Sequence, residues 1–89
     1  MTIIDQIALL GYRARDRVTD FTGVVTSVCF DLYGCQQAVL NPGINKDGKL
    51  ADCIWFDVSR LELLSEAPVM KQPDFGIEKG PAEKPSPSP

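Results

Sequence analysis

The sequence has 89 residues, of which 44% are hydrophobic and 24% are charged, and its formal net charge is −3. A chain of this length forms one small domain, and oligomerisation often supplements the limited core of such a domain. Proteins that neutralise nucleic-acid phosphates are usually basic or carry a basic stripe, so the acidic charge argues against nucleic acid as a partner.

The sequence carries no signal for export or for membrane insertion. Its first residues, Met1 to Asp5, lack a basic region, and no apolar run approaches the ~20 residues that span a bilayer. We therefore expect a cytoplasmic protein without membrane contact. In that reducing compartment we expect the three cysteines, Cys29, Cys35 and Cys53, to be reduced, buried and not essential to the fold.

Residues 1–11 predict a short helix. Thr2 and Asp5 have the spacing of a capping box, and Gly11 is a typical residue for a helix end. Two helical turns are marginal alone, so the helix must pack on the rest of the domain. The apolar face that would cover the domain as a lid consists of Ile3, Ile7 and Leu10.

Residues 12–19 alternate in the manner of a β-strand. The alternation places three basic side chains on one face, namely Arg13, Arg15 and Arg17. Two roles are open for them. One is cross-strand pairing with Asp31, Asp57 or Glu62 on a solvated face. The other is a binding site for a small, nucleotide-like anion, because arginine offers a planar fork of donors.

Further strands are predicted at residues 24–32, 35–40 and 53–58, and residues 60–64 form either a short fifth strand or a helical turn. Residues 44–52 between two of these strands, with Asn45, Lys46, Asp47 and Gly48, predict a β-hairpin turn. Consecutive short strands pair antiparallel. The sequence therefore predicts a mainly β fold, either a small antiparallel sheet or an SH3-like partly open barrel of four to five strands, with a short N-terminal helix.

The large apolar residues of these strands supply the predicted core. Its members are Val18, Val24, Val28, Phe30, Val39, Ile54, Phe56 and Leu61. Two aromatic residues are left over from this core, Tyr33 and Trp55. We expect them to lie in an interface between copies of the chain, because a small body with an open sheet edge tends to self-associate.

Composition changes near residue 67, and six of the seven prolines lie in residues 67–89. Proline removes a backbone donor, and few apolar groups are present to offset the entropy of ordering. We predict one domain over residues 1–66, followed by a disordered proline-rich tail over residues 67–89 that is dispensable for folding. Only Phe75 and Ile77 could pin this tail to the domain. The alternative role is a docking peptide for a partner.

Four stretches carry a recognisable pattern: RDRVTDFTGVVT at 15–26, YGC at 33–35, KDGK at 46–49 and WFDVSRLE at 55–62. Together they resemble a family of small proteins carried by bacteriophages, prophages and mobile gene cassettes. The resemblance implies mobile-element carriage and an SH3-like barrel, and it transfers no site residues because the family has no assigned activity. The sequence departs from the family at Asp20, where glycine is usual, but aspartate tolerates the left-handed conformation that such a turn requires.

The residues that enzymes and metal sites require are largely missing. The sequence contains no histidine, which removes the commonest proton-transfer residue. Three separated cysteines do not predict a zinc site, and isolated glycines do not predict a phosphate loop. We expect a non-enzymatic, homo-oligomeric interaction module without cofactor or metal, with a host protein as a further partner. The alternative is the anion binder that uses the three arginines.

Overall fold

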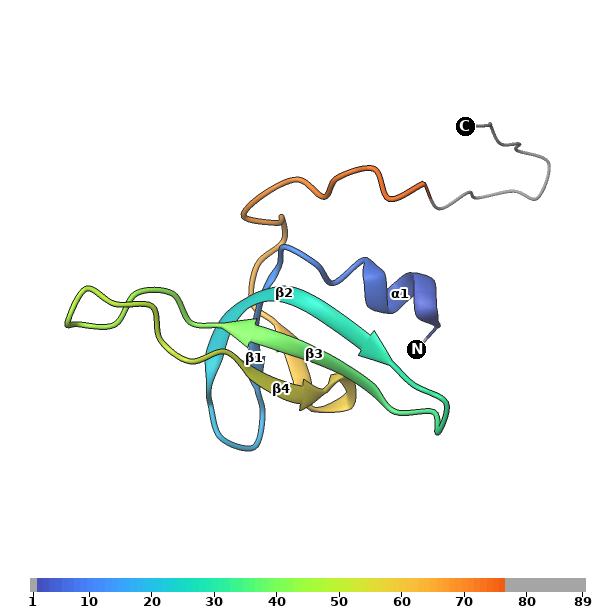
Figure 1. Ribbon diagram of the computed structural model, residues 1–89, viewed down its shortest axis with the longest axis horizontal. Helices are drawn as coiled ribbons and strands as arrows, with labels where there is room; N and C mark the ends of the chain where they lie inside the picture. The colour runs from blue at the N-terminus through green and yellow to red at the C-terminus, as the bar shows by residue number, and fades with distance from the viewer. Residues whose placement is uncertain (1, 77–89) are drawn as a thin grey trace.

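Five antiparallel strands form one sheet in the computed structural model, which describes residues 2–76 (Figure 1). The strands are β1 (Arg13–Asp16), β2 (Thr22–Phe30), β3 (Gln36–Asn41), β4 (Ile54–Asp57) and β5 (Leu61–Leu63). Their order across the sheet is β4-β3-β2-β1-β5. A short helix, α1 (Ile3–Ile7), precedes them, and a 3-10 turn, η1 (Val58–Arg60), joins β4 to β5. The predicted mainly β fold with a short N-terminal helix is confirmed.

The connection between β4 and β5 requires the sheet to curl. These strands lie at opposite edges of the sheet, yet only Val58–Arg60 separates them in the sequence. In a flat sheet, four inter-strand steps would hold them about 19 Å apart, whereas the short link reaches at most roughly 14 Å when fully extended. The sheet therefore coils until its two edges approach, in the manner of a partly open barrel. Of the two alternatives predicted for residues 60–64, the strand is found as β5, and the 3-10 turn precedes it.

Helix α1 begins at the capping box predicted from the sequence. Thr2 Oγ1 accepts a hydrogen bond from the Asp5 amide at 3.1 Å, and Asp5 Oδ2 accepts one from the Thr2 amide at 3.2 Å. The bond from the Thr2 backbone is the main reason why the pKa of the Asp5 carboxyl is lowered. No helix within residues 2–76 is long and apolar enough to cross a membrane.

The end of α1 closes over the sheet with different residues from those predicted. Regular helix stops at Ile7, and turns continue to Gly11, which has a φ of +93°. Leu9 is buried in these turns and Leu10 packs against the same cluster, but Ile3 is exposed. The predicted lid is therefore wrong at its first residue, because α1 turns Gln6 rather than Ile3 towards the sheet.

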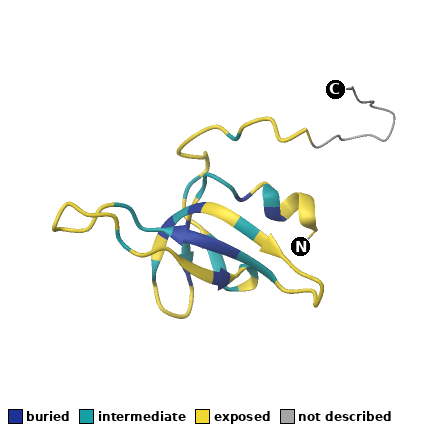
Figure 2. Ribbon diagram, viewed as in Figure 1, coloured by how far each residue is buried: buried dark blue, intermediate teal, exposed yellow. Residues whose placement is uncertain are grey.

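The core lies on the inner face of the curled sheet (Figure 2). The buried hydrophobic residues are Leu9, Ala14, Val25, Ala38, Val39, Leu40 and Phe56. Strand register explains most of this set. Val25 is paired with Leu40, and Ala38 is paired with Phe56, so their side chains meet in rows across one face. Phe56 is the one aromatic side chain among the buried residues.

Three residues of the predicted core are exposed instead. Val18 lies in a turn, because β1 ends three residues earlier than predicted. Phe30 is the last residue of β2 and Ile54 the first of β4, and at these strand ends the inner face is not covered. Val39 and Phe56 are buried as predicted. Intermediate burial is found for Val24, Val28 and Leu61.

The turn between β1 and β2 has the conformation expected at Asp20. This residue has a φ of +67°, in the left-handed region that aspartate tolerates better than most residues. Its amide donates to the Asp16 carbonyl oxygen at 2.8 Å, which closes the turn. The expectation that aspartate can stand at this position is confirmed.

A long excursion separates β3 from β4, and its outer part, residues 44–50, is called the arm here. Ile44 and Leu50 form an isolated antiparallel bridge, and the Asn45 amide donates to the Lys49 carbonyl at 2.7 Å. Gly48, with a φ of +80°, completes the predicted β-hairpin turn. The arm projects away from the sheet, as the green loop at the left of Figure 1 shows.

Residues 69–75, called the strap here, run along the link between α1 and β1 without forming a helix or a strand. The Val69 amide donates to the Gly11 carbonyl at 2.7 Å. Gln72 Nε2 donates to the carbonyl oxygens of Ile7 at 3.1 Å and Leu10 at 3.0 Å. These bonds tie the strap to the end of α1 and to the turns that follow it. Residues 77–89 of the predicted tail, including Ile77, lie outside the described residues.

The strap contacts change what we expect from truncation. A chain that ends at Glu66 loses the hydrogen bonds from Val69 and Gln72, and we expect it to be about 2–3 kcal/mol less stable than a chain that ends at Gly76. Urea unfolding of the two chains measures the difference. The full-length chain is the control, and we expect it to match the chain that ends at Gly76. Equal stability of all three chains would show that the strap contributes nothing.

Candidate functional site

The structure separates the three arginines that the sequence placed on one face. In β1, Ala14 and Asp16 are buried, so Arg13 and Arg15 lie on the opposite face of the strand. Arg17 follows the end of β1 and belongs to the turn. The predicted strand face therefore holds two arginines rather than three.

Arg15 is held by two carboxylates. Its Nη1 donates to Asp20 and its Nη2 donates to Glu62, which is its cross-strand neighbour in the β1–β5 ladder. Glu62 is the main cause of the raised pKa of the Arg15 guanidinium, and Asp20 adds to it. This arrangement corresponds to the cross-strand pairing considered from the sequence. Such partly exposed pairs contribute little to stability. Anion binding by Arg13, Arg15 and Arg17 stays a prediction.

Asp16 is the centre of a buried polar network. Its carboxylate accepts hydrogen bonds from Arg60 Nε at 2.7 Å and Nη2 at 2.6 Å. It also accepts from the amide and the hydroxyl of Thr19, at 3.0 and 2.6 Å. The Arg60 bonds are the main reason why the pKa of the Asp16 carboxyl lies well below its usual range. The network ties η1 to the β1–β2 turn.

The Asp16 network is not suited to acid–base chemistry. A general acid or base near neutral pH needs a carboxyl group whose pKa is raised, whereas Arg60 and Thr19 stabilise the charged form of Asp16. Sequence reasoning did not identify this network. The local signal was available, because an aspartate three residues before a threonine often closes a turn through its side chain.

The three cysteines are exposed free thiols, so the expectation that they are buried is wrong. Cys29 lies near the end of β2, Cys35 lies in the β2–β3 turn, and Cys53 precedes β4, all outside the covered inner face. Asp31 is the largest cause of the raised pKa of the Cys35 thiol, which disfavours the reactive thiolate. Within residues 2–76, no group of three or more Cys, Asp, Glu or His residues is arranged to hold a metal ion.

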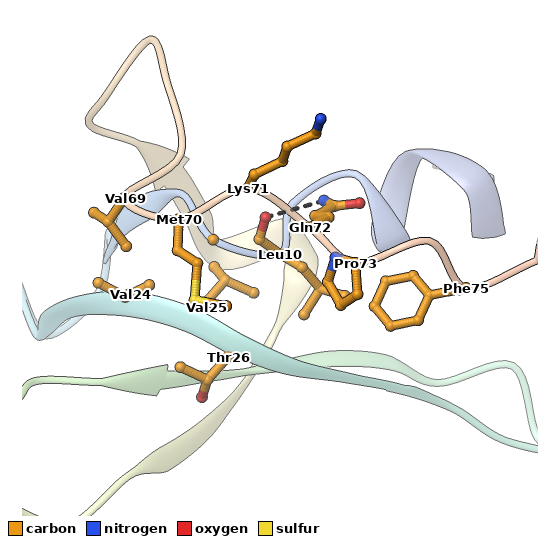
Figure 3. Close-up of a pocket in the computed structure, with 11 residues that line it drawn as sticks. Leu10, Val24, Val25, Thr26, Val69, Met70, Lys71, Gln72, Pro73 and Phe75 are labelled. Carbon is orange, nitrogen blue, oxygen red and sulfur yellow. Dashed lines mark hydrogen bonds between the residues drawn. The ribbon is translucent and has the colours of Figure 1, made fainter.

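An apolar cavity of about 330 Å³ lies between β2 and the strap. Figure 3 shows the apolar side chains around it, with Met70 and Phe75 from the strap and Val24 and Val25 from β2. Lys71 points away from the cavity in this view. Lys71 is the one charged residue among those that line the cavity, and the side-chain amide of Gln72 is bound to the carbonyl oxygens of Ile7 and Leu10.

Exposed apolar side chains lie along β4 and in the loops at its two ends. Trp55, on the strand itself, is 47% exposed, and Tyr33, in the β2–β3 turn, is 86% exposed. Both predicted interface residues are thus accessible. Their neighbours in this set are Leu32 beside Tyr33, Ile54 beside Trp55, and Ile44 and Leu50 in the arm.

The sequence prediction did not include Ile44 and Leu50 of the arm in the interface, because the polar run from Asn45 to Lys49 predicts only a turn. The signal was the pair of aliphatic residues that flank this run symmetrically, Ile44 and Leu50. Such a pair places two apolar side chains at the base of a hairpin. In the structure they are bridged to each other, and both are exposed.

Comparisons of this chain with models of known families, with curated proteins and with solved structures found no match.

Proposed function

We propose that the protein is a non-enzymatic interaction module that associates with itself through β4. The observation that carries this proposal is the exposed Trp55 on an edge strand, with Ile54 beside it. An edge strand presents unpaired N–H and C=O groups, and proteins usually protect it with lysine, proline or a covering segment. β4 has neither lysine nor proline. Ile54 and Trp55 point to opposite faces of β4, so each side of this edge carries one exposed apolar side chain.

The other edge of the sheet is less suited to this role. β5 has only three residues, and its central residue, Glu62, is paired with Arg15. Very short edge strands with a charge are a common protection against pairing. The ion pairs of Arg15 also count against the alternative function as an anion binder. Mobile-element carriage, a cytoplasmic location and a host-protein partner accompany the proposal as expectations from the sequence.

Replacement of Trp55 by glutamate is expected to weaken self-association. The substitution places a charge on the exposed apolar surface of β4, and we expect the dissociation constant to rise at least about tenfold. Light scattering over a range of micromolar concentrations gives the mass of the parent chain and of the variant.

Val18→Glu is the matched control for this variant. It adds the same charge at an exposed apolar residue in the β1–β2 turn, which is part of neither β4 nor the loops at its two ends. We expect it to associate like the parent chain. A parent chain that remains monomeric at every concentration would refute the proposed function.

A further inference from the structure

Resting on the proposed self-association, we propose that two copies form a closed two-fold dimer through β4, in which the arm of each copy lies against the β2–β3 turn of the other. The arm lies at the N-terminal end of β4, since residues 42–53 lead directly into Ile54. The β2–β3 turn lies at the opposite end. Asp57 pairs with Gln37, one residue from the last pair before that turn.

A two-fold axis through β4 brings these two segments together. The axis reverses the direction of the second strand, so that two β4 strands pair antiparallel, as their neighbours in the sheet do. The arm of one copy then extends beside the β2–β3 turn of the other, and the same contact repeats on the other side of the axis. The dimer therefore has three contacts, namely the pairing of the two β4 strands and two contacts between an arm and a β2–β3 turn. The two additional contacts are needed for stable association because β4 has only four residues.

The arm offers an apolar pair that its own chain does not cover. Ile44 is 62% exposed and Leu50 is 75% exposed, although the bridge between them fixes the hairpin. The turn at the tip adds Lys46 and Lys49, against the single carboxylate of Asp47. The arm is thus a preformed apolar projection with a net positive tip.

The opposite end of β4 has the complementary character. Leu32 and Tyr33 are exposed there, and Asp31 and Asp57 supply two negative charges. Asp31 Oδ1 accepts hydrogen bonds from the amides of Tyr33 and Cys35, both at 3.0 Å, so the turn is held in one conformation. Complementary charges fix the register of an interface and suppress wrong partners. This complementarity identifies a second copy of the chain as the occupant.

Charge reversal on both sides of the contact tests the arrangement. Lys46→Glu combined with Lys49→Glu reverses the arm tip, and Asp57→Lys reverses the facing end. Asp57 is suitable because its exposed side chain makes no capping hydrogen bond to η1. We expect each variant alone to raise the dissociation constant at least tenfold in sedimentation at low salt. Lys71→Glu, an exposed charge reversal in the strap, is the control, and it should leave association unchanged.

A mixture of the two variants distinguishes the dimer from other assemblies. In a mixed dimer, the glutamates of one arm face the introduced lysine, and the lysines of the other arm face the native Asp57, so both contacts are attractive. Native mass spectrometry should therefore show mixed dimers in preference to either homodimer. A statistical mixture would overturn the proposed contact. Growth beyond two chains would replace the closed dimer by a head-to-tail assembly.

A cross-link gives an independent measurement if a charge variant folds poorly. Asp47→Cys places a thiol at the tip of the arm, in a chain that also carries Cys29→Ser and Cys53→Ser and keeps Cys35 in the β2–β3 turn. Mild oxidation should give a covalent dimer through these two positions. A dimer that neither cross-links nor responds to charge reversal would refute this geometry and leave the proposed function standing. A monomeric parent chain would refute both.

Discussion

Phe56→Ala is expected to lower the free energy of unfolding by about 3–5 kcal/mol. The Phe56 side chain is 7% exposed and lies on the inner face of the curled sheet. The ring centroids of Phe56 and Phe21 are 5.5 Å apart. The guanidinium carbon of Arg60 lies 5.2 Å from the ring centroid of Phe56. Truncation therefore creates a cavity and removes an aromatic contact and a cation–π contact together.

The effect is large relative to the total stability of such a domain. At about 0.05–0.15 kcal/mol per residue, a domain of this size has roughly 4–11 kcal/mol, so the variant is expected to be partly unfolded at 25 °C. Urea unfolding followed by the fluorescence of Trp55 measures the change.

Phe30→Ala is the matched control for Phe56→Ala. It deletes the same atoms at the last residue of β2, where the side chain is 48% exposed, and should cost less than about 1.5 kcal/mol. Equal losses for the two variants would contradict the burial described here.

Local signals account for the features that the sequence predicted well. The capping box of α1, the left-handed residue Asp20 and the hairpin turn of the arm each depend on residues within five positions of one another. Each has a hydrogen-bonding or steric reason that tertiary contacts do not override. The end of β1 was predicted wrongly from local signals. The alternation of apolar and polar residues continues to Val18, but the side chain of Asp16 accepts a hydrogen bond from the Thr19 amide and the chain turns there.

The composition of the core was harder to predict, because burial depends on the curl of the sheet. Ala14 and Ala38 are completely buried at positions where the coiled strands leave little room. Reasoning from large apolar residues passed over both of them. The burial of Gln6 was also not predicted, because it depends on tertiary contacts. Its side-chain amide donates to the carbonyl oxygens of Cys29 and Gln37, at 2.8 and 3.0 Å.

The candidate surface was predicted in part, for a similar reason. Tyr33 and Trp55 were identified because they are aromatic residues that the predicted core leaves over. That Trp55 lies on an edge strand follows from the strand order, which the sequence does not determine. The pairing of Arg15 with Glu62 depends on the same order, because it requires β5 to return beside β1.

Asp16→Asn is expected to lower the melting temperature at neutral pH by on the order of 15 °C. The substitution removes the negative charge that Arg60 faces in the network between η1 and the β1–β2 turn. The Arg60 guanidinium, whose side chain is 37% exposed, loses its charged acceptor, while the introduced amide stays in the buried position of Asp16. Glu66→Gln is the control, because it removes an exposed carboxylate outside this network and outside the proposed dimer contact. We expect the control to melt like the parent chain.

The same variant should change how stability depends on acid. The pKa of Asp16 is lower in the folded chain than its usual value of 3.8, so the charged form stabilises the fold. This contribution is fully present above pH 3.8 and is lost as the pH falls towards the folded pKa. The parent chain should therefore lose stability steeply below about pH 4. The Asp16→Asn variant should still lose some stability as the pH falls, with a smaller slope of the same sign, because the pKa of Asp5 is also lowered.

Thermal melts between pH 2 and pH 7 measure both slopes. Combining Asp16→Asn with Arg60→Met removes the unpaired cation as well, and we expect it to recover part of the lost melting temperature. Parallel pH profiles for the parent chain and Asp16→Asn would show that the charge of Asp16 does not stabilise the fold. In that case the connection between η1 and the β1–β2 turn would depend on the backbone bond from the Arg17 amide to the Arg60 carbonyl, at 2.9 Å, rather than on the ion pair.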